Sequence, residues 1–131
     1  MKFPETHRDL FADEVKAFAF LSTTMASGTP QVTPVWFDVE KDYIRLNSAR
    51  GRVKDRNMRA RPDVALAIVD SDNPYRYIQV RGKVIKITEE GARAHIDRLA
   101  KKYLGKEMFP GDPSEVRVMY FVQPEAFSAM G

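Results

Sequence analysis

The sequence predicts a mostly β domain, an antiparallel barrel of about six strands with short helices inserted between them. Runs of β-branched and aromatic residues alternate with polar residues at a period of two, which is typical of strands with one buried face. These runs follow one another closely and are separated by Gly, Pro, Asn or Asp, as in hairpins. Because the chain has 131 residues and no linker or repeat, we expect a single domain over residues 1–131.

The first third of the chain predicts one helix and three strands. A short helix is expected over about residues 6–17, followed by strands at 18–25 ("FAFLSTTM") and 31–39 ("QVTPVWFDV"). The helix would bury one apolar stripe, formed by Leu10, Phe11, Val15 and Phe18. The turn "ASGTP" joins the two strands into a hairpin, and residues 43–47 ("YIRLN") alternate strictly enough to predict another strand.

The middle of the chain predicts a helix and two long strands. Residues 52–60 can form about two helical turns before Pro62. The run 64–70 ("VALAIVD") is apolar enough for a strand buried on both faces. Residues 75–87 form a long strand whose alternation shifts near Gly82, which predicts a bulge or a sharp bend there.

The last third predicts a helix and a final strand. Thr88 is expected to cap the helix and Gly105 to end it. Its buried stripe would be Ala92, Ile96, Leu99 and Tyr103. The final strand is expected over residues 116–122, with one face formed by Val116, Val118, Tyr120 and Val122.

The positive charge of the chain is concentrated in one segment. Residues 50–61 hold six Arg or Lys side chains and only Asp55 as a local acid, whereas the whole chain has a formal net charge of +3, so the remainder is net negative. Proteins that coat nucleic acid usually spread their cations over a face or several elements, and this distribution therefore favours a localised anion site. We expect no nucleic-acid partner.

The basic segment has the geometry of a phosphate site. A helix that starts after "NSARG" directs its unpaired N–H groups back toward the preceding strand, and Arg50, Arg52 and Lys54 would surround that end. Asn47 and Ser48 would add neutral donors. The alternative is a solvated helix face, because Arg52, Arg56 and Arg59 follow helical spacing.

Several classes of function are excluded or disfavoured. The chain has no cysteine, which excludes disulfides, thiolate metal sites and a cysteine nucleophile. His7 and His95 lack metal-ligand spacing, and His95 falls near a buried helical stripe, so we expect no metal and a structural role for His95. The N-terminal residues do not resemble a signal peptide, and no segment approaches the roughly 20 apolar residues that span a bilayer. We therefore expect a cytoplasmic protein without a membrane partner.

The sequence offers no convincing catalytic side chain, and the serines lack the GxSxG pattern of a nucleophile elbow. An enzyme without its own reactive groups needs a cofactor that carries the chemistry. Trp36, Tyr75 and Tyr77 lie at expected strand ends, where they could stack on a planar ring or pack in the core.

Three segments in order resemble the flavin-binding pyridoxamine 5'-phosphate oxidase-like family, and more closely its deazaflavin (coenzyme F420)-dependent reductase branch. They are "FAFLSTTMASGTPQVTPVWFDV", "YIRLNSARGRVKDRNMRARPDVALAIVD" and "NPYRYIQVRGKV". The resemblance covers about residues 15–125. It implies a split β-barrel that forms a homodimer, with two cofactors in grooves between the subunits.

The resemblance also implies which residues hold the cofactor. The phosphate group would be held by Asn47, Ser48, Arg50, Arg52, Lys54 and Asn57. The strand from Gln31 to Trp36 would run beside the ring, with backbone groups of Thr33, Pro34 and Val35. The groove would be lined from a neighbouring strand by Tyr75, Tyr77 and Gln79.

The implied function is that of an oxidoreductase which transfers hydride from the cofactor to a small conjugated acceptor. Six cations suit the long anionic tail of F420 better than the single phosphate of FMN, so F420 is the preferred cofactor and FMN the alternative. A non-catalytic flavin or F420 carrier and an FMN-dependent pyridoxamine-phosphate-oxidase-like enzyme are the other hypotheses. In the vitamin-processing oxidases a C-terminal segment with Trp and Arg contributes to the substrate site. The sequence ends at Gly131 without one, so we do not expect pyridoxine-phosphate oxidation.

Overall fold

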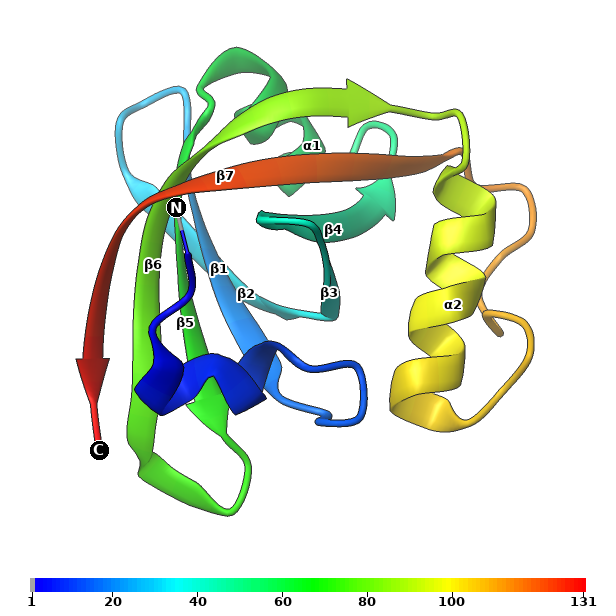
Figure 1. The fold of residues 1–131 in the computed structure, drawn as a ribbon. Coiled ribbons are helices and arrows are strands. Elements are labelled where there is room, and N and C mark those ends of the chain that lie inside the picture. The colour runs from blue at the N-terminus through cyan, green and yellow to red at the C-terminus, as the bar shows by residue number, and fades with distance from the viewer. Residues whose placement is uncertain (1) are drawn as a thin grey trace.

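Seven strands form one antiparallel sheet in the order β2-β1-β5-β6-β7-β4-β3 (Figure 1). The structure is a computed structural model, and it describes residues 2–131. The strands are β1 (Phe18–Thr24), β2 (Pro30–Val35), β3 (Phe37–Glu40), β4 (Tyr43–Ala49), β5 (Asp63–Asp70), β6 (Asn73–Thr88) and β7 (Arg117–Met130). The helices are η1 (Glu5–Phe11, a 3-10 helix), α1 (Val53–Ala60) and α2 (Ala92–Leu104). The predicted mostly β class is confirmed.

The two edge strands of the sheet, β2 and β3, are consecutive in the chain and only Trp36 separates them. The sheet must therefore curl until its edges meet, which produces a split barrel with its seam at Trp36. The prediction of one strand over residues 31–39 is wrong on this point. Val35 is the last residue to pair with β1, and Phe37 is the first to pair with β4, so the run changes partner at the seam.

The long strand β6 bends where the sequence predicts it. Its pairing with β7 shifts register between Arg81 and Gly82 and again between Val84 and Lys86. Gly82 is buried, and a Cβ at this position would lie 2.5 Å from the carbonyl oxygen of Gln123. The bend therefore needs glycine because the two backbones approach each other closely.

Strand β7 differs from the prediction at both ends. It begins at Arg117, so Val116 lies outside it and is exposed, whereas Val118, Tyr120 and Val122 are fully buried as expected. It also continues well beyond the predicted end at residue 122, to Met130. Pro124 lies within it, opposite Gly82, where the register shift removes the need for a regular ladder bond.

The helices close the ends and one side of the barrel (Figure 1). Helix η1 is shorter than the predicted helix over 6–17 and buries Leu10 and Phe11 in the barrel core. Helix α1 covers the opposite end with Met58. Helix α2 starts after Gly91, so the prediction that Thr88 caps it is wrong; Thr88 ends β6 and accepts a bond from the Glu90 N–H. No helix within residues 2–131 is long and apolar enough to cross a membrane.

One face of the sheet is left uncovered, and we call it the open face. Side chains of directly paired residues project to the same side of a sheet, so the register defines this face. It consists of Val32 and Pro34 on β2, Phe18, Phe20 and Ser22 on β1, Ala65, Ala67 and Val69 on β5, Tyr77, Gln79 and Arg81 on β6, and Ala126, Ser128 and Met130 on β7. Phe20 is 41% exposed, Val32 64% and Met130 56%, which is unusual for apolar strand residues.

Candidate functional site

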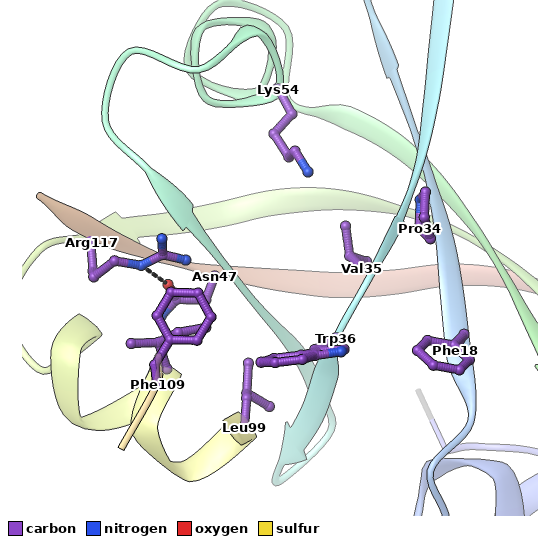
Figure 2. A pocket seen from close by; sticks show the side chains of 10 residues that line it. Phe18, Pro34, Val35, Trp36, Asn47, Lys54, Leu99, Phe109 and Arg117 are labelled. Atoms are coloured by element: carbon purple, nitrogen blue, oxygen red, sulfur yellow. Dashed lines mark hydrogen bonds between the residues drawn. The ribbon is translucent and has the colours of Figure 1, made fainter. Parts of the chain in front are cut away.

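A cavity of about 280 Å³ lies between β2, β4, α1, α2 and the loop that leads into β7 (Figure 2). It is lined by Phe18, Pro34, Val35, Trp36, Asn47, Lys54, Ile96, Leu99, Phe109 and Arg117. Five of the residues predicted to bind the cofactor therefore meet in one place: Pro34, Val35, Trp36, Asn47 and Lys54. Trp36 reaches it because the seam of the barrel is one wall of the cavity.

Stacked aromatic rings build the apolar wall of the cavity. The rings of Trp36 and Tyr103 are parallel, with an interplanar angle of 5° and centroids 5.3 Å apart, and Phe109 meets Trp36 edge-on at 5.9 Å. The Tyr103 hydroxyl donates to the Ala17 carbonyl oxygen at 2.7 Å, and burial raises the pKa of Tyr103, so the hydroxyl stays protonated. The wall is thus a fixed, flat surface suited to a planar ring.

Two cations also line the cavity, Lys54 from α1 and Arg117 from β7, and the Arg117 guanidinium lies over the Phe109 ring, 5.0 Å from its centroid (Figure 2). No carboxylate within residues 2–131 lies in salt-bridge distance of Lys54. Burial lowers the pKa of Lys54, and the charges of Arg52 and Arg117 lower it further. A half-buried ammonium without a counter-ion is costly, so the part of the cavity around Lys54 is complementary to an anion.

The other five cations of the basic segment have protein partners. Arg50 pairs with Glu89, Arg52 with Glu115 and Arg59 with Asp55, while Arg56 and Arg61 donate to the carbonyl oxygens of Gly51 and Thr24. The Arg52 to Glu115 distance is 2.6 Å and the Arg59 to Asp55 distance is 3.0 Å. Asp55 is the only acid within the segment, but Glu89 and Glu115 reach its arginines from distant parts of the chain.

A buried hydrogen-bond chain supports the cavity from behind. Asn47 Nδ2 donates to the Ala92 carbonyl oxygen at 2.9 Å and to His95 Nδ1 at 3.1 Å, and His95 Nε2 donates to Asp38 Oδ1 at 2.9 Å. Arg45 binds both carboxylate oxygens of Asp38, at 2.9 and 2.7 Å. Burial alone would raise the pKa of Asp38, but the bonds from His95 and Arg45 outweigh it and lower the pKa strongly. His95 is a buried, hydrogen-bonded residue, as its place on the helix predicts.

Four predicted residues lie near the cavity without lining it. Asn57 is buried, and its Nδ2 donates to Thr23 Oγ1 at 3.0 Å, which fastens α1 to β1. Thr23 in turn donates to Gln31 Oε1 at 3.2 Å. The hydroxyl oxygens of Thr33 and Ser48 are buried and have no hydrogen-bond partner within the described part of the chain.

The three residues predicted on β6 are not brought to the cavity of their own chain. Tyr77 and Gln79 lie on the open face, and Tyr75 is exposed near one end of the same strand. Their predicted place in a groove therefore depends on a second copy of the chain.

The sequence profile of the family described as pyridoxamine 5'-phosphate oxidase matches residues 3–129, nearly the whole chain. The chain belongs to this family. A solved structure named F420 reductase is 36% identical to this family member, with a TM-score of 0.85 over 96% of this chain and 98% of that one.

Two further solved structures share the fold at lower identity. A conserved hypothetical protein from Mycobacterium tuberculosis is 20% identical, with a TM-score of 0.72 over 99% of this chain and 86% of its own. The general stress protein 26 from Bacillus anthracis is 18% identical, with a TM-score of 0.66 over 95% of this chain and 94% of its own. No curated protein gives a significant sequence match.

Sequence reasoning missed five residues of the cavity in this family member. Phe18, Ile96 and Leu99 were expected only in the buried stripes of helices, and Phe109 and Arg117 were not singled out at all. The sequence pattern could have indicated Arg117, because it is a lone cation in the apolar run "VRVMYFV" and lies on the side opposite to the buried valines. No pattern indicated Phe109, since it lies in an irregular loop whose path depends on the tertiary bond from its N–H to Asp97 Oδ1 at 2.9 Å.

Proposed function

We propose that this protein is an oxidoreductase that binds the deazaflavin F420 in the cavity and transfers hydride to a small conjugated acceptor. The observation that carries the proposal is the pairing, in one cavity, of a flat aromatic wall with an ammonium group that has no protein counter-ion. A planar ring ending in an anionic chain has the complementary shape and charge. The 36% identity to a structure named F420 reductase supports F420 as the cofactor.

The residues present fit such a group. A volume of about 280 Å³ lies just below the roughly 300–1,000 Å³ of pockets that enclose drug-sized ligands. The cavity would therefore hold the ring and the phosphate beside Lys54, and leave the rest of the anionic tail outside. Thr33 and Ser48 each leave a buried hydroxyl oxygen without a partner, which an ordered water would satisfy.

The predicted ring contacts remain proposals, namely Gln31, Thr33, Pro34, Val35 and Trp36. The same holds for the phosphate contacts, namely Asn47, Ser48, Arg50, Arg52, Lys54 and Asn57. Lys54 has the strongest support because it needs no rearrangement, whereas Arg50 and Arg52 would first leave Glu89 and Glu115.

The cofactor, when bound, supplies the hydride. The protein's own part is to bind and orient the ring. Trp36 and Val35 offer the surface on which a ring can rest, and Phe109 covers the cavity beside them. Lys54 supplies positive charge in a place that is partly shielded from water, where it acts more strongly than at the surface.

We also propose that a second copy of the chain covers the open face. Phe18 and Pro34 belong both to the open face and to the lining of the cavity, so a partner seated there would also close the mouth of the cavity. Tyr75, Tyr77 and Gln79 of that partner would then line the groove, as the resemblance implies.

Titration of the purified protein with F420 and with FMN tests the cofactor. We expect micromolar or tighter binding of F420, followed by the fluorescence of the ligand. The Lys54→Gln variant should bind about ten times more weakly or worse, because a charge-assisted bond is lost. Lys106→Gln, at an exposed lysine outside the cavity, is the matched control. Affinity for FMN alone would transfer the proposal to that cofactor, and affinity for neither would refute it.

A turnover assay distinguishes an enzyme from a carrier protein that only binds the cofactor. Reduced F420 is mixed with the protein and a panel of quinones, nitro compounds and enones, and the absorbance of the reduced form is followed. We expect oxidation of the cofactor by at least one acceptor class. Binding without any oxidation would instead support a carrier.

A further inference from the structure

We propose that Arg117 is the residue that grips the phosphate of the cofactor beside Lys54, and that the chain Asn47–His95–Asp38 holds its guanidinium in position. The inference rests on the proposed function and extends it to Arg117, His95 and Asp38, which neither the sequence pattern nor the resemblance assigned to phosphate binding. Asn47, which the resemblance assigned to the phosphate, would instead hold Arg117 in position.

Arg117 lies where the anion is expected. It is the first residue of β7 and pairs with Ala49 at the end of β4, directly before the turn that leads into α1. It therefore shares its end of the cavity with Lys54, which projects from the first turn of α1 (Figure 2). The two side chains come from different elements and converge on the same space.

The guanidinium of Arg117 is buried yet has an unused donor group. Arg117 is only 6% exposed. Its Nε donates to Asn47 Oδ1 at 2.9 Å and its Nη1 to Glu115 Oε1 at 3.2 Å, while Nη2 has no partner within residues 2–131. A guanidinium is a planar fork suited to two parallel bonds to phosphate oxygens, so a free arm in a cavity is a binding feature.

Positive charge exceeds negative charge around this arm. Glu115 is the nearest acid, and it is shared between Arg117 and Arg52, while Arg93 donates to its carbonyl oxygen at 3.2 Å. Burial lowers the pKa of Arg117, and Glu115 only partly opposes this, because Arg52 and Arg93 lower it further. An anion placed between Lys54 and Arg117 would relieve this repulsion.

The hydrogen-bond chain leaves the guanidinium little freedom. Asn47 uses both amide hydrogens, on Ala92 and His95, and its oxygen accepts from Arg117, so its amide group has one satisfied orientation. Since Asn47 donates to His95 Nδ1, the neutral ring carries its hydrogen on Nε2 and donates it to Asp38. Asp38 is in turn fixed by Arg45. Arg117 is thus held in position before a ligand arrives, which favours tight binding.

Ligand pairs with and without phosphate test the role of Arg117. The affinities of FMN and riboflavin, and of F420 and its phosphate-free deazaflavin fragment, are measured for the wild type and Arg117→Gln. We expect the preference for the phosphorylated ligand to fall by about tenfold or more, with the affinity for the phosphate-free ligand within about twofold. Arg117→Lys can keep the ion pair with Glu115 but lacks the fork, and it should show a smaller loss of the same preference. Arg56→Gln removes one exposed charge from α1 and should change nothing.

His95 tests the positioning role. His95→Leu breaks the chain, whereas the amide of His95→Gln can still donate to Asp38. We expect the preference for the phosphorylated ligand to fall in His95→Leu and to be largely restored in His95→Gln. Melting temperatures are recorded in parallel. A lower melting temperature in His95→Leu with an unchanged preference would show that the chain is only structural.

The outcomes separate this inference from the proposed function. If the wild type binds F420 or FMN and both Arg117 variants keep the full preference for phosphate, the inference is wrong and the function stands. An equal loss for phosphorylated and phosphate-free ligands would also overturn it, because Arg117 would then contact the ring or support the fold. If the wild type binds none of the four ligands, both are wrong.

Discussion

At the scale of single residues, Asp55 holds the basic segment in place. Its buried carboxylate accepts the Gly51 N–H at 2.9 Å, the Arg59 guanidinium at 3.0 Å and the Tyr120 hydroxyl. These bonds tie the turn before α1, the helix itself and β7 together. Lys54 is the preceding residue, so its direction into the cavity depends on this carboxylate.

The charge of Asp55 makes a pH-dependent contribution to stability. Burial alone would raise its pKa, but the bonds from Tyr120, Gly51 and Arg59 outweigh it, so the pKa lies below its ordinary value. A carboxyl group with a lowered pKa in the folded state stabilises the fold above its unfolded pKa of about 3.9, and this contribution is lost as the pH falls through the folded pKa.

We therefore expect Asp55→Asn to lower the free energy of unfolding by about 3 kcal/mol at pH 7, because buried charge-assisted bonds are lost. The difference from the wild type should shrink below about pH 4, because the carboxyl group is protonated in the unfolded wild type before it is protonated in the folded protein. Urea denaturation at a series of pH values measures both. The test extends to pH 3, roughly one unit below the ordinary pKa. A difference in the free energy of unfolding that stays constant down to this pH would contradict a stabilising charge on Asp55.

The sequence shows that residues 50–61 are basic, but it does not show which of these cations lacks a partner in the folded protein. Arg50 and Arg52 are neutralised by Glu89 and Glu115, which are far away in the chain, and only the folded sheet brings them together. The predicted importance of Lys54 therefore has structural support, whereas Arg117 emerged only from the packing of β7 against β4.

At the scale of elements, the bend of β6 lets one strand serve two parts of the barrel. Up to Lys83 it pairs with β5 on one side and β7 on the other, and beyond this point it continues with β7 alone. The shift also admits Pro124 into β7. The bend thus lets β7 extend to Met130 along the open face.

We expect Gly82→Ala to destabilise the protein by about 1–3 kcal/mol, because the new Cβ would lie 2.5 Å from the Gln123 carbonyl oxygen and the strands would have to separate. Urea denaturation monitored by circular dichroism measures the loss. A matched substitution is Glu125→Ala, at an exposed residue of β7 outside the open face, which should change stability by no more than about 0.5 kcal/mol. Equal stability of Gly82→Ala and the wild type would show that the backbones can move apart freely.

The periodicity of apolar residues and the positions of turn residues predicted most elements, including the bend at Gly82 and the end of α2 at Gly105. They could not predict that the run 31–39 changes partner at Trp36, because alternation is local and strand pairing is not. Nor could they predict the full length of β7, since proline normally ends a strand and Pro124 is tolerated only at a register shift made by another strand.

At the scale of the whole molecule, the main feature is the open face, whose apolar side chains stay exposed in a single chain. It combines exposed Phe20, Val32 and Met130 with small residues on β5, and it runs without interruption into the mouth of the cavity at Phe18. Several large apolar side chains exposed together on one sheet face are unusual for a monomer. The homodimer implied by the resemblance would bury them.

Charge on this face should prevent the proposed dimer from forming. We expect Val32→Glu to convert the assembly into a monomer of 15.0 kDa, because burying an unpaired carboxylate between two apolar faces is unfavourable. Analytical ultracentrifugation measures the mass. Ile85→Glu, at an exposed isoleucine of β6 outside the open face, is the control and should leave the dimer intact. A wild type that sediments as a monomer, or a Val32→Glu dimer, would contradict this role for the face.

The chain contains one tryptophan, Trp36, and it occupies both the seam of the barrel and the wall of the cavity. Its indole is therefore an optical label that needs no engineering. A ligand resting against it would quench its emission, and a change in how the two sheet edges meet would shift the emission colour. Occupancy of the cavity and opening of the barrel can thus be followed separately in the unmodified protein.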